Sequence, residues 1–430
     1  MLVAAAILAA VLIRPHRHPA PAPISMAPEP AAPAAALPVA AWGPSARGRL
    51  ERELRDAFAP ALAGASRWSL AVVAGDGKLL YDERAGRAVV PASVQKLVIA
   101  ASSLDSLGPG YRYHTILAAR DGISDGGLLE GNLWLIGSGD TSLQSDDLRA
   151  GAGTLARAGL RRIGGGVVVD ATALRGPGLN RHWAPDDDGQ DYAAPVSAIS
   201  VDEDTVETHA VVGGVEQTFW APMQDVARDV ALLMQGILAR RGIVAAMPPA
   251  VAAAPLDTVV LWDHRSAPLK ALIAHMLFVS DNHYAEQLLR TLGEEVTGVS
   301  DDTGGLAAER AFLERTGVPT PGLRLYDGSG LSPDNRVAAI TLARLLAAAE
   351  PSLYPLLPLG GRQGTLADYD FTTALGRVRA KTGHLSGVSA LAGYVTTMHS
   401  GRVAFAFVID GSPGNPDAAI VRAADRLAAF

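Results

Sequence analysis

Three short polar motifs, far apart in the chain, constrain the fold more than any other feature. They are Ser93-Val94-Gln95-Lys96, Ser280-Asp281-Asn282 and Lys381-Thr382-Gly383. Each motif alone is a weak signal, because a serine three positions before a lysine arises by chance in most chains of this length. Together and in this order they indicate acyl transfer through a serine ester. We therefore expect the chain to fold back on itself so that the three motifs line one cleft.

The apolar-rich stretch from Pro91 to Leu104 predicts a buried helix that begins at Ser93. Positions i and i+3 share a helix face, so the side chains of Ser93 and Lys96 point into the same cleft. The helix N-terminus also supplies a positive backbone field, which stabilises an oxyanion. Lys96 can take the proton of Ser93 if partial burial and a second cation, Lys381, lower its pKa. The alternative is an N-cap serine beside a solvated lysine.

The second motif follows the apolar helical run from Leu272 to Val279. The hydroxyl of Ser280 can pass a proton between Lys96 and a leaving amine. The side-chain amide of Asn282 can bond both Lys96 and a substrate carbonyl. The alternative is a capping loop after a buried helix, where short polar residues are common.

The third motif ends a predicted strand, and there we expect Lys381 and Thr382 to hold the terminal carboxylate of a substrate. Gly383 leaves room for an extended substrate to pair alongside the strand. The backbone N–H of His384, with that of Ser93, is the expected oxyanion hole. The alternative is an edge-strand lysine that only improves solubility.

The two ends of the chain together predict one domain. A helix over 47–62 and strands over 68–73 and 79–83 precede Ser93. The chain closes with a helix that starts at Asn415 and with strands over 377–381, 389–397 and 403–410. These elements predict an α+β fold, a five-stranded antiparallel sheet flanked by helices.

The long stretch between the first two motifs predicts an inserted domain that is rich in α and β structure. We expect strands over 111–118, 128–136 and 166–170, and amphipathic helices over 146–158 and 225–241. The chain then divides into a signal or anchor segment (1–14), a Pro/Ala-rich linker (15–44), a catalytic domain from two stretches (45–105 and 261–430) and an inserted domain (106–260).

Composition narrows the function further. Acidic residues outnumber basic ones, 44 to 37, and no basic stripe is interleaved with aromatic residues, so we expect no nucleic-acid partner. Cysteine is absent, which excludes disulfides, thiolate metal sites and cysteine nucleophiles. His264, His275 and His283 show no metal-ligand spacing, so we predict no metal and no cofactor.

The N-terminal stretch from Leu2 to Ile13 is wholly apolar. It is shorter than the roughly 20 residues that a membrane-spanning helix needs. It suits the apolar part of a signal peptide, although the usual preceding positive charge is missing. We expect export to a periplasmic or other extracytoplasmic space, or retention at the membrane through this segment.

Longer segments, one of which includes the second motif, carry a resemblance. They are 131–140, 194–198, 280–286, 327–332, 364–366 and 391–395, and they span most of 45–430. On these residues the chain resembles the DacB-like D-alanyl-D-alanine carboxypeptidase/endopeptidases, which are low-molecular-mass penicillin-binding proteins. The resemblance implies a β-lactamase/transpeptidase-like catalytic domain that acts on peptidoglycan stem peptides in the cell-wall space. The implied reactions are release of the terminal D-Ala, cleavage of D-Ala–meso-diaminopimelate crosslinks, and acylation of Ser93 by β-lactam antibiotics.

Two positions depart from the family pattern. Residue 384 is usually Thr or Ser, and His384 lacks the hydroxyl that helps to grip the substrate carboxylate. Pro333 stands where an Arg often meets a carboxylate on the substrate side chain, and Arg336 or Arg362 is a candidate replacement.

The resemblance also implies that an aromatic and an acidic residue of the inserted domain contact that side chain. Trp183, Asp186 and Tyr192 are the candidates. The alternative is an ordinary acidic surface loop, because Asp186 is the first of three consecutive aspartates.

Two other functions stay open at this point. A serine β-lactamase needs a group that activates water against the acyl-enzyme, and the sequence reveals none; the large insertion also disfavours it. A non-catalytic protein that only binds peptidoglycan or β-lactams has no use for Lys96.

Overall fold

The structure is a computed structural model that describes residues 42–212, 215–413 and 415–430. The expected signal or anchor segment, and the expected linker up to residue 41, lie outside these residues. The linker was expected to end at 44, but the folded region begins earlier. Trp42 is buried against Phe430, with ring centroids 5.7 Å apart, and the first described helix starts at Pro44.

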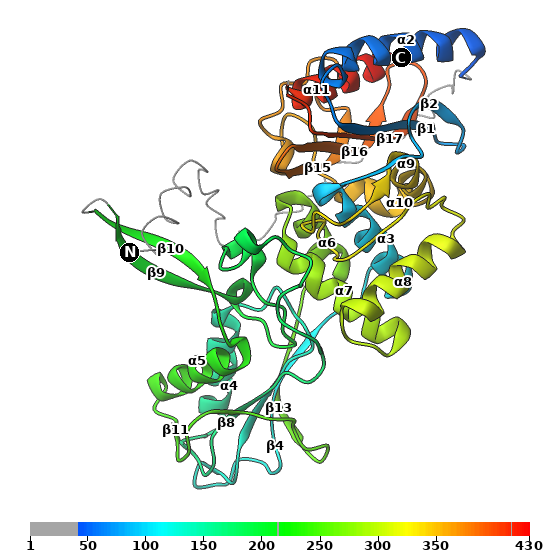
Figure 1. Ribbon diagram of the computed structural model, residues 1–430. Helices are drawn as coiled ribbons and strands as arrows, with labels where there is room; N and C mark the ends of the chain where they lie inside the picture. Colours follow the sequence, from blue (N-terminus) through cyan, green and yellow to red (C-terminus); the bar gives the residue numbers. More distant parts are fainter. Residues whose placement is uncertain (1–41, 213–214, 414) are drawn as a thin grey trace. The chain divides into compact units, whose positions relative to one another are not determined.

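The central sheet joins the two ends of the chain (Figure 1). Its strands run in the order β15-β16-β17-β1-β2, and all neighbours are antiparallel. Their bounds are β1 (Arg67–Ala74), β2 (Leu79–Glu83), β15 (Val378–Leu385), β16 (Val388–Thr396) and β17 (Arg402–Asp410). β16 and β17 are apolar on both faces because helices cover both faces of the sheet. The predicted five-stranded antiparallel sheet is confirmed.

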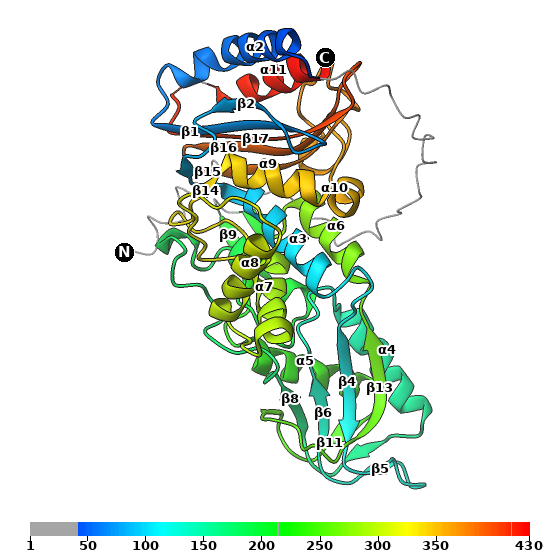
Figure 2. The same ribbon diagram turned by 90° about the vertical axis from the view of Figure 1, so that its right-hand side faces the viewer.

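One face of the sheet is covered by α2 (Pro44–Leu62) and α11 (Pro416–Ala428), which pack on each other (Figure 2). Leu54 and Phe58 of α2 are fully buried there, and burial of such a side chain contributes about 1.5–3 kcal/mol. Asn415 caps α11 by accepting the N–H of Ala418, as its position before Pro416 predicted.

The opposite face carries the helices that position the three motifs. α9 packs on β1 and β17, and the short helix η2 packs on β15 and β16. The elements on this side are η2 (Ala92–Gln95), α3 (Lys96–Ser106), α6 (Leu269–Val279), α7 (Asn282–Thr297), α8 (Asp302–Arg315), α9 (Ala339–Ala348), α10 (Glu350–Leu353), η6 (Tyr354–Leu356), η7 (Gly364–Leu366) and the small strand pair β3 (Ala88–Val89) and β14 (Val337–Ala338).

A second five-stranded sheet lies in the long stretch between the first two motifs, in the order β12-β8-β6-β4-β13. Its strands and its neighbours are β4 (His114–Ala119), β6 (Leu133–Ile136), β8 (Val167–Asp170), β12 (Ala250–Val251) and β13 (Val259–Arg265), the short strands β5 (Leu128–Leu129), β7 (Arg162–Ile163) and β11 (Val244–Ala245), and the helices α4 (Ser145–Arg157) and α5 (Val226–Arg240). The single strand expected over 128–136 is instead two, because Gly131 turns the chain at φ +73°. The domain bounds stay a prediction, and β13 crosses the one expected at residue 260.

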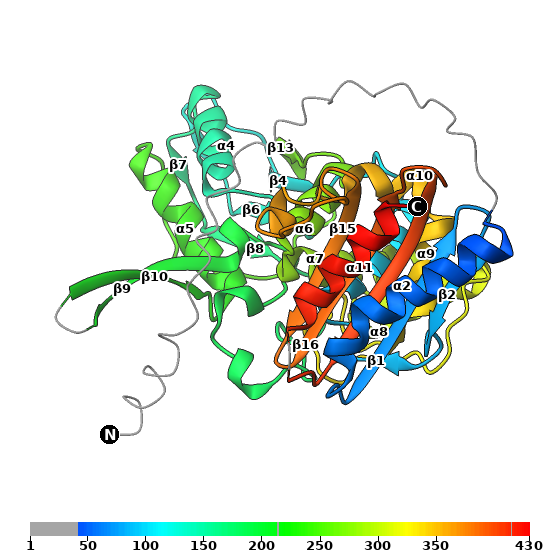
Figure 3. The same cartoon turned by 90° about the horizontal axis from the view of Figure 1, so that it is seen from above.

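Between β8 and α5 the chain forms three short helices and a hairpin. These are η3 (Pro185–Asp187), η4 (Asp191–Ala193), η5 (Asp202–Asp204), β9 (Thr205–Val212) and β10 (Val215–Pro222). β9 and β10 pair only with each other within the described chain and run outward as a hairpin (Figure 3).

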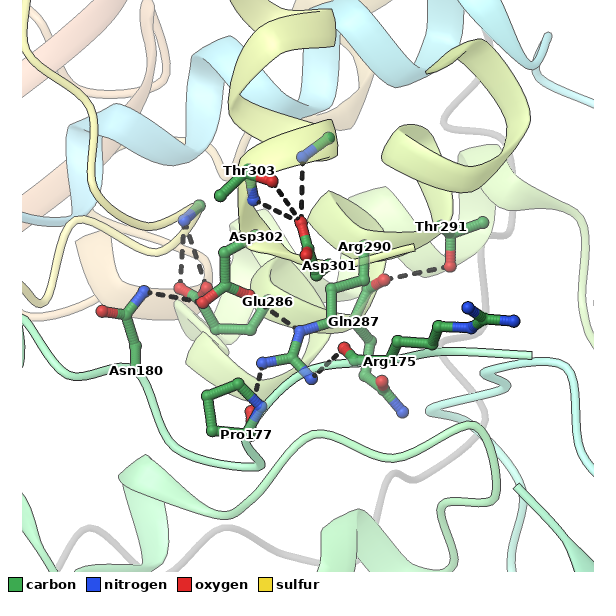
Figure 4. A network of polar contacts seen from close by, with 12 residues as sticks. Arg175, Pro177, Asn180, Glu286, Gln287, Arg290, Thr291, Asp301, Asp302 and Thr303 are labelled. Carbon is green, nitrogen blue, oxygen red and sulfur yellow. Dashed lines mark hydrogen bonds and ion pairs between the residues drawn. The ribbon is translucent and has the colours of Figure 1, made fainter. Parts of the chain in front are cut away.

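A buried arginine fixes the start of this region to α7. The guanidinium of Arg290 donates to Asp302 Oδ1 at 2.8 Å and to the carbonyls of Arg175 and Pro177 (Figure 4). Further along, Asn180 Nδ2 donates to the carbonyl of Tyr326 at 2.7 Å. Because Arg290 is only 2% exposed, this clamp is shielded from water and holds the loop before Trp183 in place.

Candidate active site

Ser93 lies in the 3₁₀ helix η2, and the α-helix begins only at Lys96. The expectation of an α-helix starting at Ser93 is therefore wrong by three residues. The tight turn follows Ala92, a buried residue with φ +51°, and strained backbone of this kind concentrates at functional sites. The turn still places both side chains together, because Lys96 Nζ lies 3.0 Å from Ser93 Oγ.

Lys96 is fully buried and is held by groups from three parts of the chain. Besides Ser93, its Nζ donates to Asn282 Oδ1 at 2.6 Å and to the carbonyl of Ser329 at 2.8 Å. These three acceptors match the three protons of an ammonium group. In the neutral amine, the Ser93 hydroxyl can instead donate to the lone pair of Nζ.

Burial lowers the pKa of Lys96 to about 8, although the carboxylates of Asp327 and Glu286 oppose the change. We expected a second cation, Lys381, to share in this effect, but desolvation is its cause. With that pKa about one lysine in ten is neutral at pH 7 and able to accept a proton.

The Ser280-Asp281-Asn282 motif joins α6 to α7. Ser280 has a left-handed backbone, φ +67°, that ends α6, and Asp281 caps α7 by accepting the N–H of Tyr284 at 3.0 Å. Asn282 is the first residue of α7 and contacts Lys96, as expected. The Ser280 hydroxyl is half-buried and makes no hydrogen bond to the described residues, so its role as a proton relay stays a prediction.

Lys381 is also fully buried, inside β15 and not at the end of a strand as predicted. Its Nζ donates to the carbonyl of Thr382 at 2.7 Å, and Thr382 Oγ1 donates to Thr365 Oγ1 at 2.8 Å. Burial and the positive charge of Lys96 hold the pKa of Lys381 well below its usual value. The two ammonium groups therefore lie close enough to repel, although no hydrogen bond links Lys381 to Ser93 in the described part of the chain.

Gly383 lies against the turn that carries Ser93. A Cβ atom at this position would lie 3.0 Å from the carbonyl oxygen of Pro91 and 3.1 Å from the amide nitrogen of Val94. The structure shows that the glycine leaves room for η2, and its expected role in making room for substrate stays a prediction.

His384 is exposed, and its ring is engaged with residues outside the motifs. Nε2 lies 3.2 Å from Asp417 Oδ1 on α11 and 3.3 Å from the hydroxyl of Tyr369. The hydrogen bond from His384 holds the pKa of Asp417 below its usual value. The backbone of His384 is on the edge strand β15, and its expected share in an oxyanion hole stays a prediction.

Of the three candidates from the 183–192 loop, Tyr192 contacts a motif residue, and Trp183 contacts Asp327, which in turn bonds Gln95 of the first motif. Trp183 Nε1 donates to Asp327 Oδ2 at 3.1 Å, and the carbonyl of Tyr192 accepts from Asn282 Nδ2 at 3.0 Å. The hydroxyl of Tyr192 instead bonds Asp187 at 2.9 Å. Asp186 is exposed, and within the described residues its carboxylate contacts none of the motif residues.

The segment 327–332 contributes more than we inferred from the sequence, where only the resemblance marked it. Asp327 accepts from the side chain of Gln95, and Ser329 supplies the carbonyl that bonds Lys96. Gly330 has φ +81°, and a Cβ there would lie 2.1 Å from the carbonyl oxygen of Ala92. The segment is therefore packed against η2. It reaches Lys96 through a backbone carbonyl, which a motif of side chains does not reveal.

Arg336, one proposed replacement for the arginine missing at Pro333, is tied to its own loop. It donates to the carbonyls of Pro333 and Asn335, both at 2.7 Å. Arg362, the other, is exposed.

Glu203, His275 and Asp281 have the chemistry to hold a cation. Their ligand atoms all lie within 4.8 Å of one another, and all three residues are half-buried. Asp281 raises the pKa of Glu203 to about 8. No metal-ligand spacing marks this cluster in the sequence, because Glu203 is distant along the chain from His275 and Asp281.

Comparisons with known proteins agree with this geometry. A model of the D-Ala-D-Ala carboxypeptidase 3 (S13) family matches residues 48–217 and 212–429. The chain is 31% identical over 446 residues to a D-alanyl-D-alanine carboxypeptidase of Actinomadura sp. (strain R39), covering 86% of this chain and 82% of that protein. It is also 31% identical over 444 residues to carboxypeptidase DacB of Mycolicibacterium smegmatis, covering 96% and 91%. Penicillin-binding protein 4 from Haemophilus influenzae shares the fold, with a TM-score of 0.78 at 22% identity over 87% of this chain and 98% of that one.

Proposed function

The chain belongs to the D-Ala-D-Ala carboxypeptidase 3 (S13) family, and from that premise we propose that Ser93 is the nucleophile of this serine DD-carboxypeptidase/endopeptidase. The observation that carries the proposal is the 3.0 Å contact between Ser93 Oγ and the fully buried Nζ of Lys96. A lysine with a lowered pKa, within hydrogen-bond reach of a hydroxyl, is the arrangement that activates a serine.

The first step is acylation of Ser93. Neutral Lys96 takes the hydroxyl proton while Oγ attacks the carbonyl carbon of the penultimate D-Ala in a peptidoglycan stem peptide. The peptide C–N bond then breaks, and the leaving amine receives a proton from Lys96, directly or through Ser280. Water hydrolyses the ester in the second step and restores the hydroxyl. The same steps cleave a crosslink when the leaving amine belongs to a meso-diaminopimelate side chain.

The other motif residues bind and orient the substrate. Asn282 already bonds Lys96, and its position at the start of α7 suits an amide contact to the substrate backbone. Lys381 supplies a buried positive charge for the terminal carboxylate, with Thr382 beside it. Trp183 lies next to Asp327 and Tyr192 next to Asn282, and these two residues are the favoured contacts for the substrate side chain. In this proposal the catalytic domain (45–105 and 261–430) carries out the reaction, and the inserted domain (106–260) recognises the substrate side chain.

β-Lactams are expected to acylate the same serine, because they present a reactive amide to the same nucleophile. Intact-protein mass spectrometry after incubation with benzylpenicillin tests this. We expect one stoichiometric adduct on the wild type and on Ser103→Ala, a matched change in α3, and no adduct on Ser93→Ala. Release of D-Ala from a muropeptide should be lost in Ser93→Ala as well. Many turnovers of a chromogenic cephalosporin without a trapped adduct would instead identify a β-lactamase.

The proposed reaction requires access to peptidoglycan, so we place the protein outside the cytoplasm, in the periplasm or an equivalent cell-wall space. The apolar segment near the N-terminus is the proposed export signal or membrane anchor. None of the helices in the described segments combines the length and apolar character that crossing a bilayer requires. Detection of the processed N-terminus in a membrane-free extracytoplasmic fraction would distinguish a cleaved signal from an anchor.

A further inference from the structure

α7 presents two polar side chains toward Lys96, one helical turn apart. Asn282 contacts Lys96 directly, with Oδ1 2.6 Å from Nζ. Glu286, four residues later on the same face, is 2% exposed and makes no contact with Lys96 among the described residues. Its Oε1 instead accepts the backbone N–H groups of Ser329 at 2.7 Å and of Gly328 at 3.1 Å, and its Oε2 lies 3.3 Å from the nitrogen of Gly328.

Ser329 links Glu286 to Lys96 through its own backbone. Its N–H donates to Glu286, and its carbonyl accepts from Lys96 Nζ at 2.8 Å. Glycines hold the segment tightly on both sides. A Cβ at Gly328 would lie 2.8 Å from the carbonyl oxygen of Ala285 on α7, and one at Gly330 would meet η2. The Ser329 carbonyl therefore has little freedom while Glu286 holds the adjacent N–H groups.

A second buried carboxyl, Glu309 on α8, provides a contrast. It is fully buried, and neither of its oxygens has a hydrogen-bond partner within 42–212, 215–413 and 415–430. Burial raises the pKa of both carboxyls, to about 8 for Glu286, and the carboxyl of Asp327 adds to the effect on each. Asp302 also raises the pKa of Glu286, and Glu286 raises that of Glu309. The two residues are therefore alike in chemistry and burial, but only Glu286 touches the segment that bonds Lys96.

We propose that Glu286 is a positioning residue, which fixes the Ser329 carbonyl so that this carbonyl directs the Lys96 amine at Ser93. The proposal rests on the proposed function only in taking Lys96 as the base for Ser93. The role belongs mainly to Oε1 of Glu286, because the N–H of Ser329 bonds this oxygen and the N–H of Gly328 is shared between it, at 3.1 Å, and Oε2, at 3.3 Å.

Three variants distinguish the effect of the Glu286 hydrogen bonds on acylation from the effects of its charge and of a buried carboxyl in general. Glu286→Gln keeps an acceptor oxygen in the same place, Glu286→Leu removes it, and Glu309→Leu makes the same apolar change at the matched buried carboxyl. The measurement is the second-order rate constant of acylation by benzylpenicillin as a function of pH, normalised to the fraction of protein that is eventually labelled.

We expect acylation of Glu286→Leu to slow by about tenfold, a part of the general-base contribution. The rise of its rate with pH should also move to lower pH. The Ser329 carbonyl stabilises the Lys96 ammonium, so a displaced carbonyl lowers the pKa of Lys96. Loss of the Glu286 charge lowers this pKa as well, and Glu286→Gln, which loses the charge but keeps an acceptor oxygen, measures that part of the change separately. Glu286→Gln should stay within about threefold of the wild type, and Glu309→Leu should match it in rate and pH profile. A purely structural role for Glu286 would reduce the labelled fraction and leave the pH profile unchanged.

The proposal is overturned if Glu286→Leu has the wild-type rate and pH profile, or if Glu286→Gln is as slow as Glu286→Leu, which would assign the role to charge. If Glu286→Leu does not fold, Glu286→Asp replaces it with the same expectations, because its carboxylate is withdrawn by one methylene. Failure of the proposed function looks different, since the wild type itself would then not be acylated at Ser93.

Discussion

The surroundings of Lys96 and of Lys381 differ, although both ammonium groups are fully buried. Lys96 has three acceptors, from η2, α7 and the 327–332 segment. Lys381, on the edge strand β15, bonds only the carbonyl and hydroxyl of the adjacent Thr382 within the described chain. A buried cation is costly unless the protein replaces its hydration. Lys96 is therefore surrounded by acceptors from three segments, whereas Lys381 bonds only its neighbour Thr382 among the described residues, which is consistent with the proposal that a substrate carboxylate is its partner.

Among the variants that test the difference between the two lysines, replacement of Lys96 should have the largest effect on the rate of acylation. Lys96→Ala removes the base, so acylation by benzylpenicillin should slow by about 10²–10⁴-fold. Stopped-flow fluorescence with a labelled penicillin measures the rate. Near-normal acylation in this variant would show that another group activates Ser93.

The pH dependence of the wild type should report Lys96. The amine accepts a proton only when neutral, and its pKa is lowered to about 8. The acylation rate should therefore fall by about tenfold for each pH unit below this value and level off above it. A rate that is flat between about pH 6 and 9 would mean that no lysine with this pKa limits the step.

Lys381→Met tests whether Lys381 recognises the substrate carboxylate. Loss of the buried charge should weaken acylation by carboxylate-bearing substrates by about tenfold, or roughly 1.4 kcal/mol. Substrates with an amide in place of the carboxylate should lose much less. Equal losses for the two kinds of substrate would show that Lys381 does not recognise the carboxylate.

Gly383→Ala should give the smallest effect. Its Cβ would press on Pro91 and Val94, so η2 must move by a few tenths of an ångström. We expect acylation to slow several-fold and the free energy of unfolding to fall by about 1–3 kcal/mol, typical of an overpacked core. Chemical denaturation and the acylation assay check the two effects. Gly75→Ala, which directly follows β1 of the same sheet, is the matched control, because a Cβ there would lie 3.8 Å from the carbonyl oxygen of Arg402 and would not press on η2.

The sequence predicted those parts of the site that depend on local spacing. Ser93 and Lys96 are three residues apart, so one turn of either helix type brings them together. The sheet followed from alternating and continuous apolar runs at the two ends of the chain. The sequence did not reveal those features of the site that depend on backbone groups and on long-range packing. The Ser329 carbonyl has no side-chain signature, and the contact of Gly383 with η2 exists only in three dimensions.

The contacts of the loop from 183 to 192 were also hard to predict, because they too depend on backbone groups and on residues distant in the sequence. Tyr192 reaches Asn282 through its carbonyl and not through its ring. Trp183 is fixed by Asp327, which is distant in the sequence. Neither contact follows from the identity of the residue at that position.

The position of β1 between β2 and β17 has a consequence for how the protein is made. β1 starts at Arg67, whereas its partner β17 starts only at Arg402. Pairing across such a sequence separation closes late. An emerging chain that already contains the Ser93 turn therefore lacks the strand that carries Lys381, and we expect it to stay inactive until β15 has been made and can pair in the sheet.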